Sequence, residues 1–256
     1  MCHKNFRNKM TNSLHNFENS WDSQERAESY SKLEFPNTYY LAYRDLPKII
    51  SSHVNGNLAI DFGCGTGRST RFIKNLGFKV IGIDISPEML QIAKKSDPSG
   101  EYQLVSDGEY SHLGLSKYDL VQSIFTFDNI PDWDDRTNIL IGLRDLLNPA
   151  GKLICLDATP ELYTHEWASF TTRDFPENWR AKTGDIVRDI MLDVEDKTPV
   201  EDIYWTVDDY QKLFIKAGLS VESIYKPLGK KDEPFKWISE LKIAPWIIFV
   251  LKKQNN

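Results

Sequence analysis

From residue 57 onward, the apolar residues of the chain switch repeatedly between a spacing of two and a spacing of three or four. The first spacing is typical of a buried strand and the second of one face of a helix. Strands are predicted at 57–62, 79–84, 101–107, 118–125, 152–157, 220–226 and 245–253, and helices at 67–77, from 87, at 133–148 and at 206–218. This alternation predicts an α/β fold with a mostly parallel, seven-stranded sheet and helices on both faces.

Two regions lie outside the alternation. Residues 20–52 predict two helices broken near Pro36, which form an N-terminal helical cap. Residues 159–205 are rich in aromatic side chains, and 185–192 can pair with 200–205 as a hairpin. An aromatic segment inserted after the fifth strand predicts a lid over a binding site.

We therefore expect one domain with additions, since 256 residues suit a single α/β domain. Its expected parts are a disordered start (1–19), the helical cap (20–52), a ligand-binding core (53–158), the lid (159–205) and the end of the sheet (206–256).

Composition and charge narrow the possible partners. The formal net charge is -6, so no basic field favours nucleic acid or an anionic membrane. Cys2, Cys64 and Cys155 are odd in number and widely spaced, which predicts neither disulfides nor a metal site and fits a reducing cytoplasm. The longest apolar run, 243–251, is too short to span a bilayer. We expect a cytoplasmic protein without stable membrane insertion; monomer and homodimer both stay open.

The stretch "LAIDFGCGTGRST" (58–70) predicts a strand, a glycine turn and a helix N-terminus. Backbone N–H groups at such a turn can meet a ligand directly. A dinucleotide site would need a glycine at position 68, where Arg68 stands. Asp61 followed by alternating glycines instead suits a ligand that carries an ammonium and a carboxylate.

The motif "DFGCGTG" (61–67) resembles the first motif of the class I S-adenosylmethionine-dependent methyltransferases, and the chain looks nearest to their quinone-type and small-molecule members. The resemblance implies a Rossmann-like sheet with an antiparallel last strand and S-adenosyl-L-methionine as the cofactor. By the same resemblance, Asp84 would accept the ribose hydroxyls and Asp107 the adenine amino group. The other implied cofactor-binding residues are Tyr30, Asp61, Gly63, Cys64, Gly65, Gly67, Ile85, Met89, Gly108 and Ser123.

The reaction implied by the resemblance is methyl transfer, for which alignment and desolvation matter most. Where a base is needed, the candidates are Asp128, just after the fourth strand, and His165 in the expected lid. Relatives often carry histidine where Asp128 stands, and a carboxylate there can instead bind an amine.

The methyl acceptor is narrowed by two absences. "SIFTFDN" (123–129) replaces the N-P-P-Y type motif of nucleic-acid base amine methylases, and no Pro-Cys nucleophile is present. We expect an O- or N-methyltransferase of a small metabolite. Two alternatives stay open: a C-methyltransferase of quinone or lipid precursors, which needs a long apolar tunnel, and a non-catalytic cofactor-binding module.

Overall fold

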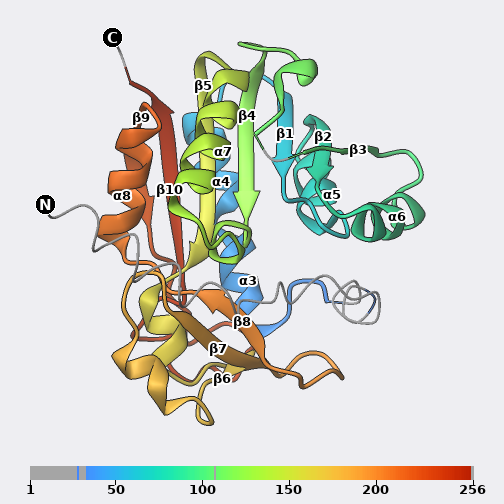
Figure 1. Ribbon diagram of the computed structural model, residues 1–256. Helices are drawn as coiled ribbons and strands as arrows, with labels where there is room; N and C mark the ends of the chain where they lie inside the picture. The colour runs from blue at the N-terminus through green and yellow to red at the C-terminus, as the bar shows by residue number, and fades with distance from the viewer. Residues whose placement is uncertain (1–27, 29–32, 107, 255–256) are drawn as a thin grey trace, which may run out of the picture.

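The computed structural model describes residue 28, residues 33–106 and residues 108–254 (Figure 1). The predictions for residues 1–19, Tyr30 and Asp107 therefore lie outside the described residues.

A seven-stranded sheet forms the centre of the molecule (Figure 1). From edge to edge its strands are β3 (Glu101–Leu104), β2 (Lys79–Asp84), β1 (Leu58–Phe62), β4 (Tyr118–Ile124), β5 (Leu147–Ala158), β10 (Trp246–Lys253) and β9 (Leu219–Tyr225). The first five strands run parallel, and β10 runs antiparallel to both β5 and β9. The predicted fold class, with its antiparallel last strand, is confirmed.

Helices cover both faces of this sheet. Successive residues of a strand point to opposite faces, so Ala59 packs with α3, α4 and α5, whereas Ile60 packs with α7 and α8. The α-helices are α3 (Asn37–Arg44), α4 (Leu46–His53), α5 (Arg68–Asn75), α6 (Pro87–Ser96), α7 (Trp133–Leu146) and α8 (Val207–Lys216). Short 3₁₀ turns are η1 (Ser111–Leu113), η2 (Phe127–Asn129), η3 (Pro160–Thr164) and η4 (Pro176–Arg180).

One predicted boundary was wrong, and another stays a prediction. The predicted break near Pro36 falls directly before α3, and the helix expected ahead of it lies mostly outside the described residues. The two described helices of the cap meet at Asp45. Proline is tolerated at a helix start, and Pro47 likewise stands in the first turn of α4. Strand β5 begins at Leu147 rather than at residue 152, since Leu147 pairs with Tyr118 before an irregularity shifts the register.

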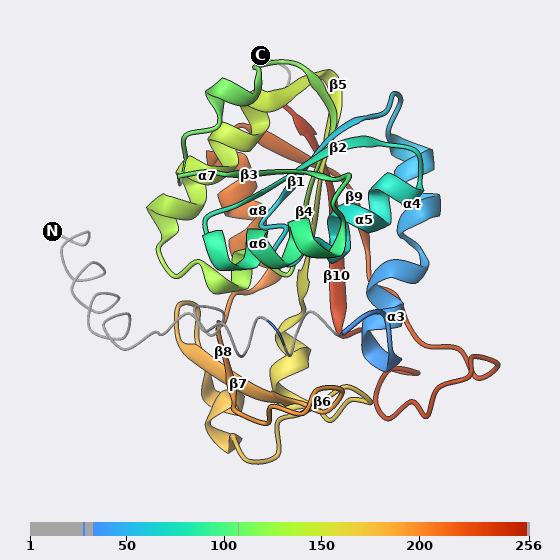
Figure 2. The same cartoon turned by 90° about the vertical axis from the view of Figure 1, so that its right-hand side faces the viewer.

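Residues 159–205 fold into a small antiparallel sheet beyond the carboxyl ends of the parallel strands (Figure 2). Its strands are β6 (Phe170–Thr171), β7 (Ile186–Met191) and β8 (Val200–Ile203). The predicted hairpin is confirmed, with Ile186 opposite Ile203. Trp167 is fully buried in the segment, and its indole N–H donates to the carbonyl of Leu162 at 2.8 Å.

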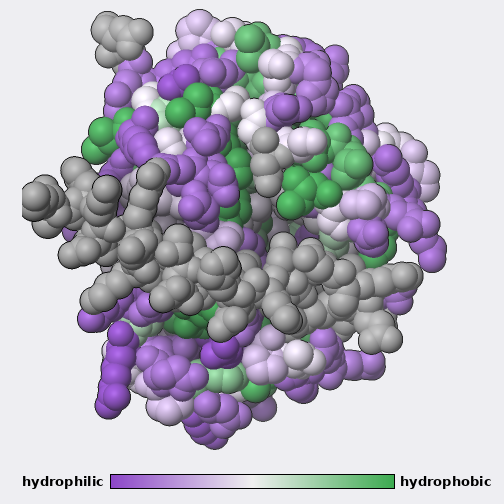
Figure 3. Space-filling view, in the orientation of Figure 1, coloured by the Kyte–Doolittle hydropathy of each residue, from purple (hydrophilic) through white to green (hydrophobic). Residues whose placement is uncertain are grey.

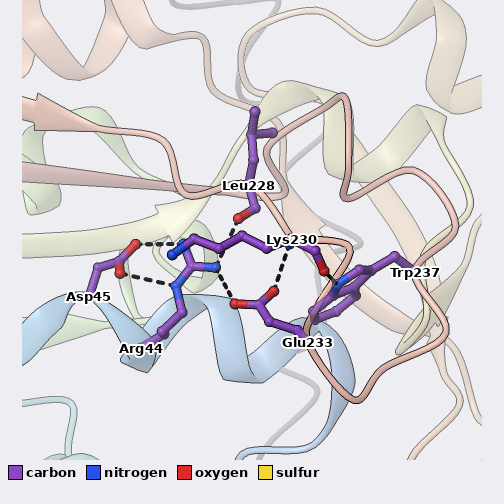
Figure 4. A network of polar contacts seen from close by, with 6 residues as sticks. All are labelled: Arg44, Asp45, Leu228, Lys230, Glu233 and Trp237. Atoms are coloured by element: carbon purple, nitrogen blue, oxygen red, sulfur yellow. Dashed lines mark hydrogen bonds and ion pairs between the residues drawn. The ribbon is translucent and has the colours of Figure 1, made fainter.

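The loop at 226–245, between β9 and β10, is fixed against the end of α3 (Figure 4). The guanidinium of Arg44 donates to both carboxylate oxygens of Asp45, to the carbonyl of Leu228 and to Glu233. These partners raise the pKa of Arg44 further above its usual value. The network ties the end of α3 to this loop, and the Nε1–H of Trp246 at the start of β10 donates to the carbonyl of Thr38 in α3. Both α3 and β10 contribute to the cavity described below.

Hydrophilic residues cover most of the described surface on the face shown in Figure 3, with small groups of hydrophobic residues between them. Among the described residues, no helix has the length and apolar character that a bilayer crossing requires.

Candidate active site

The glycine turn lies between the end of β1 and the start of α5. The N–H groups of Gly63 and Cys64 both donate to the carbonyl of Ile83, at 2.9 and 3.1 Å, which ties the turn to β2. Gly67 adopts φ +82° and immediately precedes α5. The turn therefore presents its backbone where parallel strands end, the usual ligand site of open α/β sheets.

Gly65 is the glycine of this turn that opens into free space. Its φ is +50°, and a Cβ built there would meet only the sulfur of Met89, at 4.0 Å. A Cβ on Gly63 or Gly67 would instead collide with Thr126 or Tyr102, so those two glycines serve close packing. The space above Gly65 fits a ligand that touches the backbone, as an adenosyl amino acid would at this turn.

Asp84, at the end of β2, is held rigidly beside this space. Its Oδ2 accepts the N–H of Gly65 at 2.8 Å, and its Oδ1 accepts the N–H of Ser86 at 2.9 Å. Ser86 in turn caps α6 through the N–H of Met89. A carboxylate fixed in this way can accept hydroxyl groups of a bound sugar.

Asp61 holds the turn from behind. It is fully buried and accepts hydrogen bonds from Ser69 (2.7 Å), Thr70 (2.6 Å) and Gln122 (2.9 Å), which belong to α5 and β4. It does not line the cavity. Burial raises the pKa of Asp61 to about 6, although these hydrogen bonds oppose the shift. Asp61 is therefore placed to position the glycine turn rather than to touch a ligand.

Asp61→Asn is expected to change how stability depends on pH. The ordinary pKa of an aspartate is near 4, and that of Asp61 in the folded state is about 6. Such a raised pKa stabilises the folded state fully below pH 4, and this contribution is lost as the pH rises through 6. The loss is roughly 3 kcal/mol, and the neutral variant escapes it. Urea denaturation at pH 4 and pH 7 should show the variant gaining that amount relative to the wild type. Asp208→Asn, at an exposed position, should show no such gain, and a pH-independent difference for Asp61→Asn would contradict the assignment.

A cavity of about 510 Å³ begins at the glycine turn and extends to the small sheet. Its lining includes Gly63 and Gly65 from the turn, Asp84 from β2, Met89 from α6 and Met191 from β7. The size is ordinary for a small-molecule site. The cavity thus joins the residues predicted to bind the cofactor to the segment predicted as a lid.

One wall of the cavity is aromatic. The ring of Phe125 lies 4.7 Å from that of Trp246, and Phe170 stands edge-on to Trp246 at 5.6 Å. Tyr39 packs on Phe170 at 5.1 Å. Phe125 adopts φ +58°, which bulky residues rarely do, and such strained backbone gathers at functional sites.

Carboxylates gather on another side, contributed by three elements. Asp128 from η2, Asp189 from β7 and Asp202 from β8 all line the cavity and are buried. Burial raises the pKa values of Asp128 and Asp202, and mutual repulsion adds to the rise for Asp202. Just behind them, burial and the charge of Asp128 raise the pKa of Asp157 to about 7.

The cavity brings together most of the predicted site residues that the structure describes. Those that line it are Gly63, Cys64, Gly65, Asp84, Ile85, Met89 and Asp128. Gly67, Gly108 and Ser123 do not line it, and Ser123 is fully buried within the sheet. His165 also lies outside the lining: its Nδ1 meets Thr164 and the carbonyl of Glu161, and its ring faces Trp167 and Trp179.

Several residues that line the cavity were not predicted from the sequence. Of the seven large aromatic residues in 159–205, Phe170 is the one in the lining. Asp189 and Asp202 carried a readable signal, because each alternates with buried apolar residues, as in Val187, Asp189, Met191. An acid on the buried face of a strand indicates a functional cavity. Trp246 and Phe125 carried no comparable signal.

Comparison with known proteins agrees with this geometry. Residues 60–155 match the family model described as a methyltransferase domain. The chain is 27% identical over 218 residues to the N-demethylindolmycin N-methyltransferase of Streptomyces griseus, which covers 81% of this chain and 91% of that relative. It is 26% identical over 161 residues to a ubiquinone biosynthesis O-methyltransferase of Cereibacter sphaeroides, across 54% of this chain and 61% of the relative.

Solved structures share the fold. An S-adenosylmethionine-dependent methyltransferase from Clostridium acetobutylicum superposes with a TM-score of 0.62 at 16% identity, over 90% of this chain and 98% of that one. The CcbJ methyltransferase from Streptomyces caelestis gives a TM-score of 0.64 at 15% identity, over 93% of this chain and 100% of that one. Residues 60–155 thus match a methyltransferase domain, and the chain has the Rossmann-like fold of solved S-adenosylmethionine-dependent methyltransferases.

Proposed function

We propose that the enzyme methylates an oxygen or nitrogen atom of a small metabolite held in the 510 Å³ cavity. The observation that carries this proposal is the continuity of the cavity, which runs from Gly65 to Phe170 and Asp202 of the 159–205 segment. The names of two relatives, an N-demethylindolmycin N-methyltransferase and a ubiquinone biosynthesis O-methyltransferase, support nitrogen or oxygen as the methylated atom.

The cofactor-binding end of the cavity is assigned to the residues around the glycine turn. Asp84 would accept the ribose hydroxyls, Ile85 and Met89 would pack on the adenine, and the open space at Gly65 would receive the amino-acid part. S-adenosylmethionine supplies an electrophilic methyl group when bound. The protein's own part is to align the acceptor and to exclude water, which can account for much of the barrier reduction.

We propose that residues 159–205 act as the substrate lid. They supply Leu162, Phe170, Met191 and Val200 to the lining, so the acceptor would contact this segment. A compact cavity supports a small acceptor over the long apolar tunnel that a quinone or lipid precursor requires. Buried carboxylates beside the cofactor end support turnover over a passive binding module.

We also propose that the enzyme works in the cytoplasm, since Cys64 and Cys155 are buried free thiols.

Asp84→Ala tests the cofactor assignment. The variant is expected to bind S-adenosylhomocysteine about 10- to 150-fold more weakly, because hydrogen bonds to a charged acceptor contribute roughly 1.5 to 3 kcal/mol. Isothermal titration calorimetry measures the affinity directly. Asp208→Ala removes a carboxylate from an exposed position of α8 and should leave it unchanged. Unchanged affinity in Asp84→Ala would refute the assignment of this strand end to the cofactor.

A further inference from the structure

The charges around the cavity are strongly biased. Of the described residues that line it, Asp84, Asp128, Asp135, Asp189 and Asp202 are acidic, whereas Arg68 is the one lysine or arginine. The guanidinium of Arg68 donates to the carbonyls of Leu33 and Glu34 and lies 5.1 Å from the ring centre of Tyr39. A cavity with this balance disfavours anionic ligands and favours cationic ones.

Asp202 offers an acceptor that the described protein does not use. Its side chain is more than nine-tenths buried and lines the cavity. The hydroxyl of Tyr163 donates to its Oδ2 at 3.1 Å. Within residues 33–106 and 108–254, no hydrogen bond reaches its Oδ1. Because Asp202 lines the cavity, this oxygen is placed to accept a hydrogen bond from a ligand that enters it.

Asp128 from η2 supplies a second carboxylate to the same cavity. Its Oδ1 accepts the side-chain amide of Asn129 at 2.9 Å, and the backbone N–H groups of Asp128 and Asn129 also donate to the carboxylate. The positive charge of Arg136 acts on Asp128, but Arg136 also faces Asp157 and Tyr210 and stacks over Trp205 at 4.1 Å. One arginine does not balance the carboxylates of Asp128, Asp157 and Asp202.

We propose that the methyl acceptor is a compact amine with an apolar or aromatic body, which enters as its ammonium and is held by Asp202 and Asp128 opposite the rings of Phe125, Phe170 and Trp246. This inference rests on the proposed function. The carboxylate oxygens are acceptors for the N–H donors of an ammonium group, and the aromatic wall matches both the apolar body and the positive charge.

The carboxylate also has a chemical task, since an ammonium nitrogen has no lone pair. Asp202 Oδ1 accepts one N–H proton, and the freed lone pair forms the new N–C bond. The S–C bonding pair stays on sulfur, so the cofactor product leaves neutral and the amine leaves methylated. Tyr163, bonded to Oδ2, positions the carboxylate for this transfer.

Matched probes test the proposal: 2-phenylethylamine, 2-phenylethanol and 3-phenylpropanoate, titrated by calorimetry at pH 8 with saturating S-adenosylhomocysteine. We expect the amine to bind at least tenfold more tightly than the alcohol, the carboxylate to bind weakest, and the amine to gain a methyl group by mass spectrometry with S-adenosylmethionine. In Asp202→Asn, which keeps an acceptor for Tyr163, the preference for the amine should fall to within about twofold. Asp174→Asn, exposed on the same segment, should keep it.

The outcomes distinguish a failure of the amine inference from a failure of the proposed function. Failure of S-adenosylhomocysteine to bind the wild-type protein overturns the proposed function. If it binds but the alcohol matches the amine, or no amine binds, the amine inference falls and the proposed function stands. Retention of the full preference in Asp202→Asn, with normal S-adenosylhomocysteine affinity as proof of folding, overturns the role of Asp202.

Discussion

Gly65→Val is expected to abolish S-adenosylhomocysteine binding, with at least a 100-fold loss of affinity, while the protein stays folded. The valine side chain would occupy the free space between Gly65 and Met89, which belongs to the cavity. A branched residue at φ +50° is also strained, by roughly 1 to 2 kcal/mol. Calorimetry measures the affinity, and far-UV circular dichroism with urea denaturation measures the fold.

Gly77→Val is the matched control for this strain. Gly77 has φ +96°, and a Cβ built there would meet nothing within 4 Å. It follows α5 and does not line the cavity. This variant should lose a similar amount of stability and keep its affinity within twofold. If both variants bind equally well, the space at Gly65 does not belong to the cofactor; if Gly65→Val unfolds while Gly77→Val does not, Gly65 serves packing.

Local chemistry explains why the sheet and the glycine turn were predictable. Each strand of the main sheet carries its own apolar run, and the turn needs alternate positions with φ above zero, which only glycine adopts easily. Ser86, which caps α6, and Gly77, which has positive φ after the end of α5, are equally local signals.

The substrate half of the cavity was not predictable in this way, because it is assembled from distant segments. Trp246 reaches the wall from the last strand, and its indole N–H donates to the carbonyl of Thr38, 208 residues away in sequence. His165 was chosen for its chemistry and its place in the segment, yet the fold turns it toward Trp179 instead. Residue type alone does not show which side of an inserted segment faces the site.

The role of Asp202 was only partly predictable from the sequence. The strand pattern places it on the same buried face as Val200, which marks it as unusual, but nothing in the sequence brings β8 next to η2. The pairing with Asp128, which gives the acidic side of the cavity its charge, requires the tertiary fold.

Arg136→Met is expected to destabilise the protein by about 3 to 5 kcal/mol at pH 8, the usual loss when one partner of a buried charge group is removed. Arg136 is fully buried; its Nε donates to the carbonyl of Ile130, and its guanidinium stacks on Trp205. Burial lowers its pKa, which the charges of Asp157 and Asp128 oppose. Without the arginine, the carboxylates of Asp128 and Asp157 would be buried without that nearby positive charge. Methionine keeps most of the packing volume, so the loss would come mainly from the charge.

The loss in free energy of unfolding caused by Arg136→Met should be smaller by about 2 kcal/mol at pH 5 than at pH 8. Such a pH dependence would show that the loss is electrostatic. Asp157 has a folded pKa near 7 already, and loss of the guanidinium raises it further. A raised carboxyl pKa withdraws stability as the pH climbs through it, so the variant suffers most above pH 7 and least where the carboxyls are protonated. Urea denaturation at both pH values measures this, and adding Asp157→Asn should restore part of the loss at pH 8.

Arg173→Met, at an exposed position, should change stability by less than about 0.5 kcal/mol. An equal deficit for Arg136→Met at pH 5 and pH 8 would mean that Arg136 stabilises the fold through packing on Trp205, and that the acidic side of the cavity holds its charge without it.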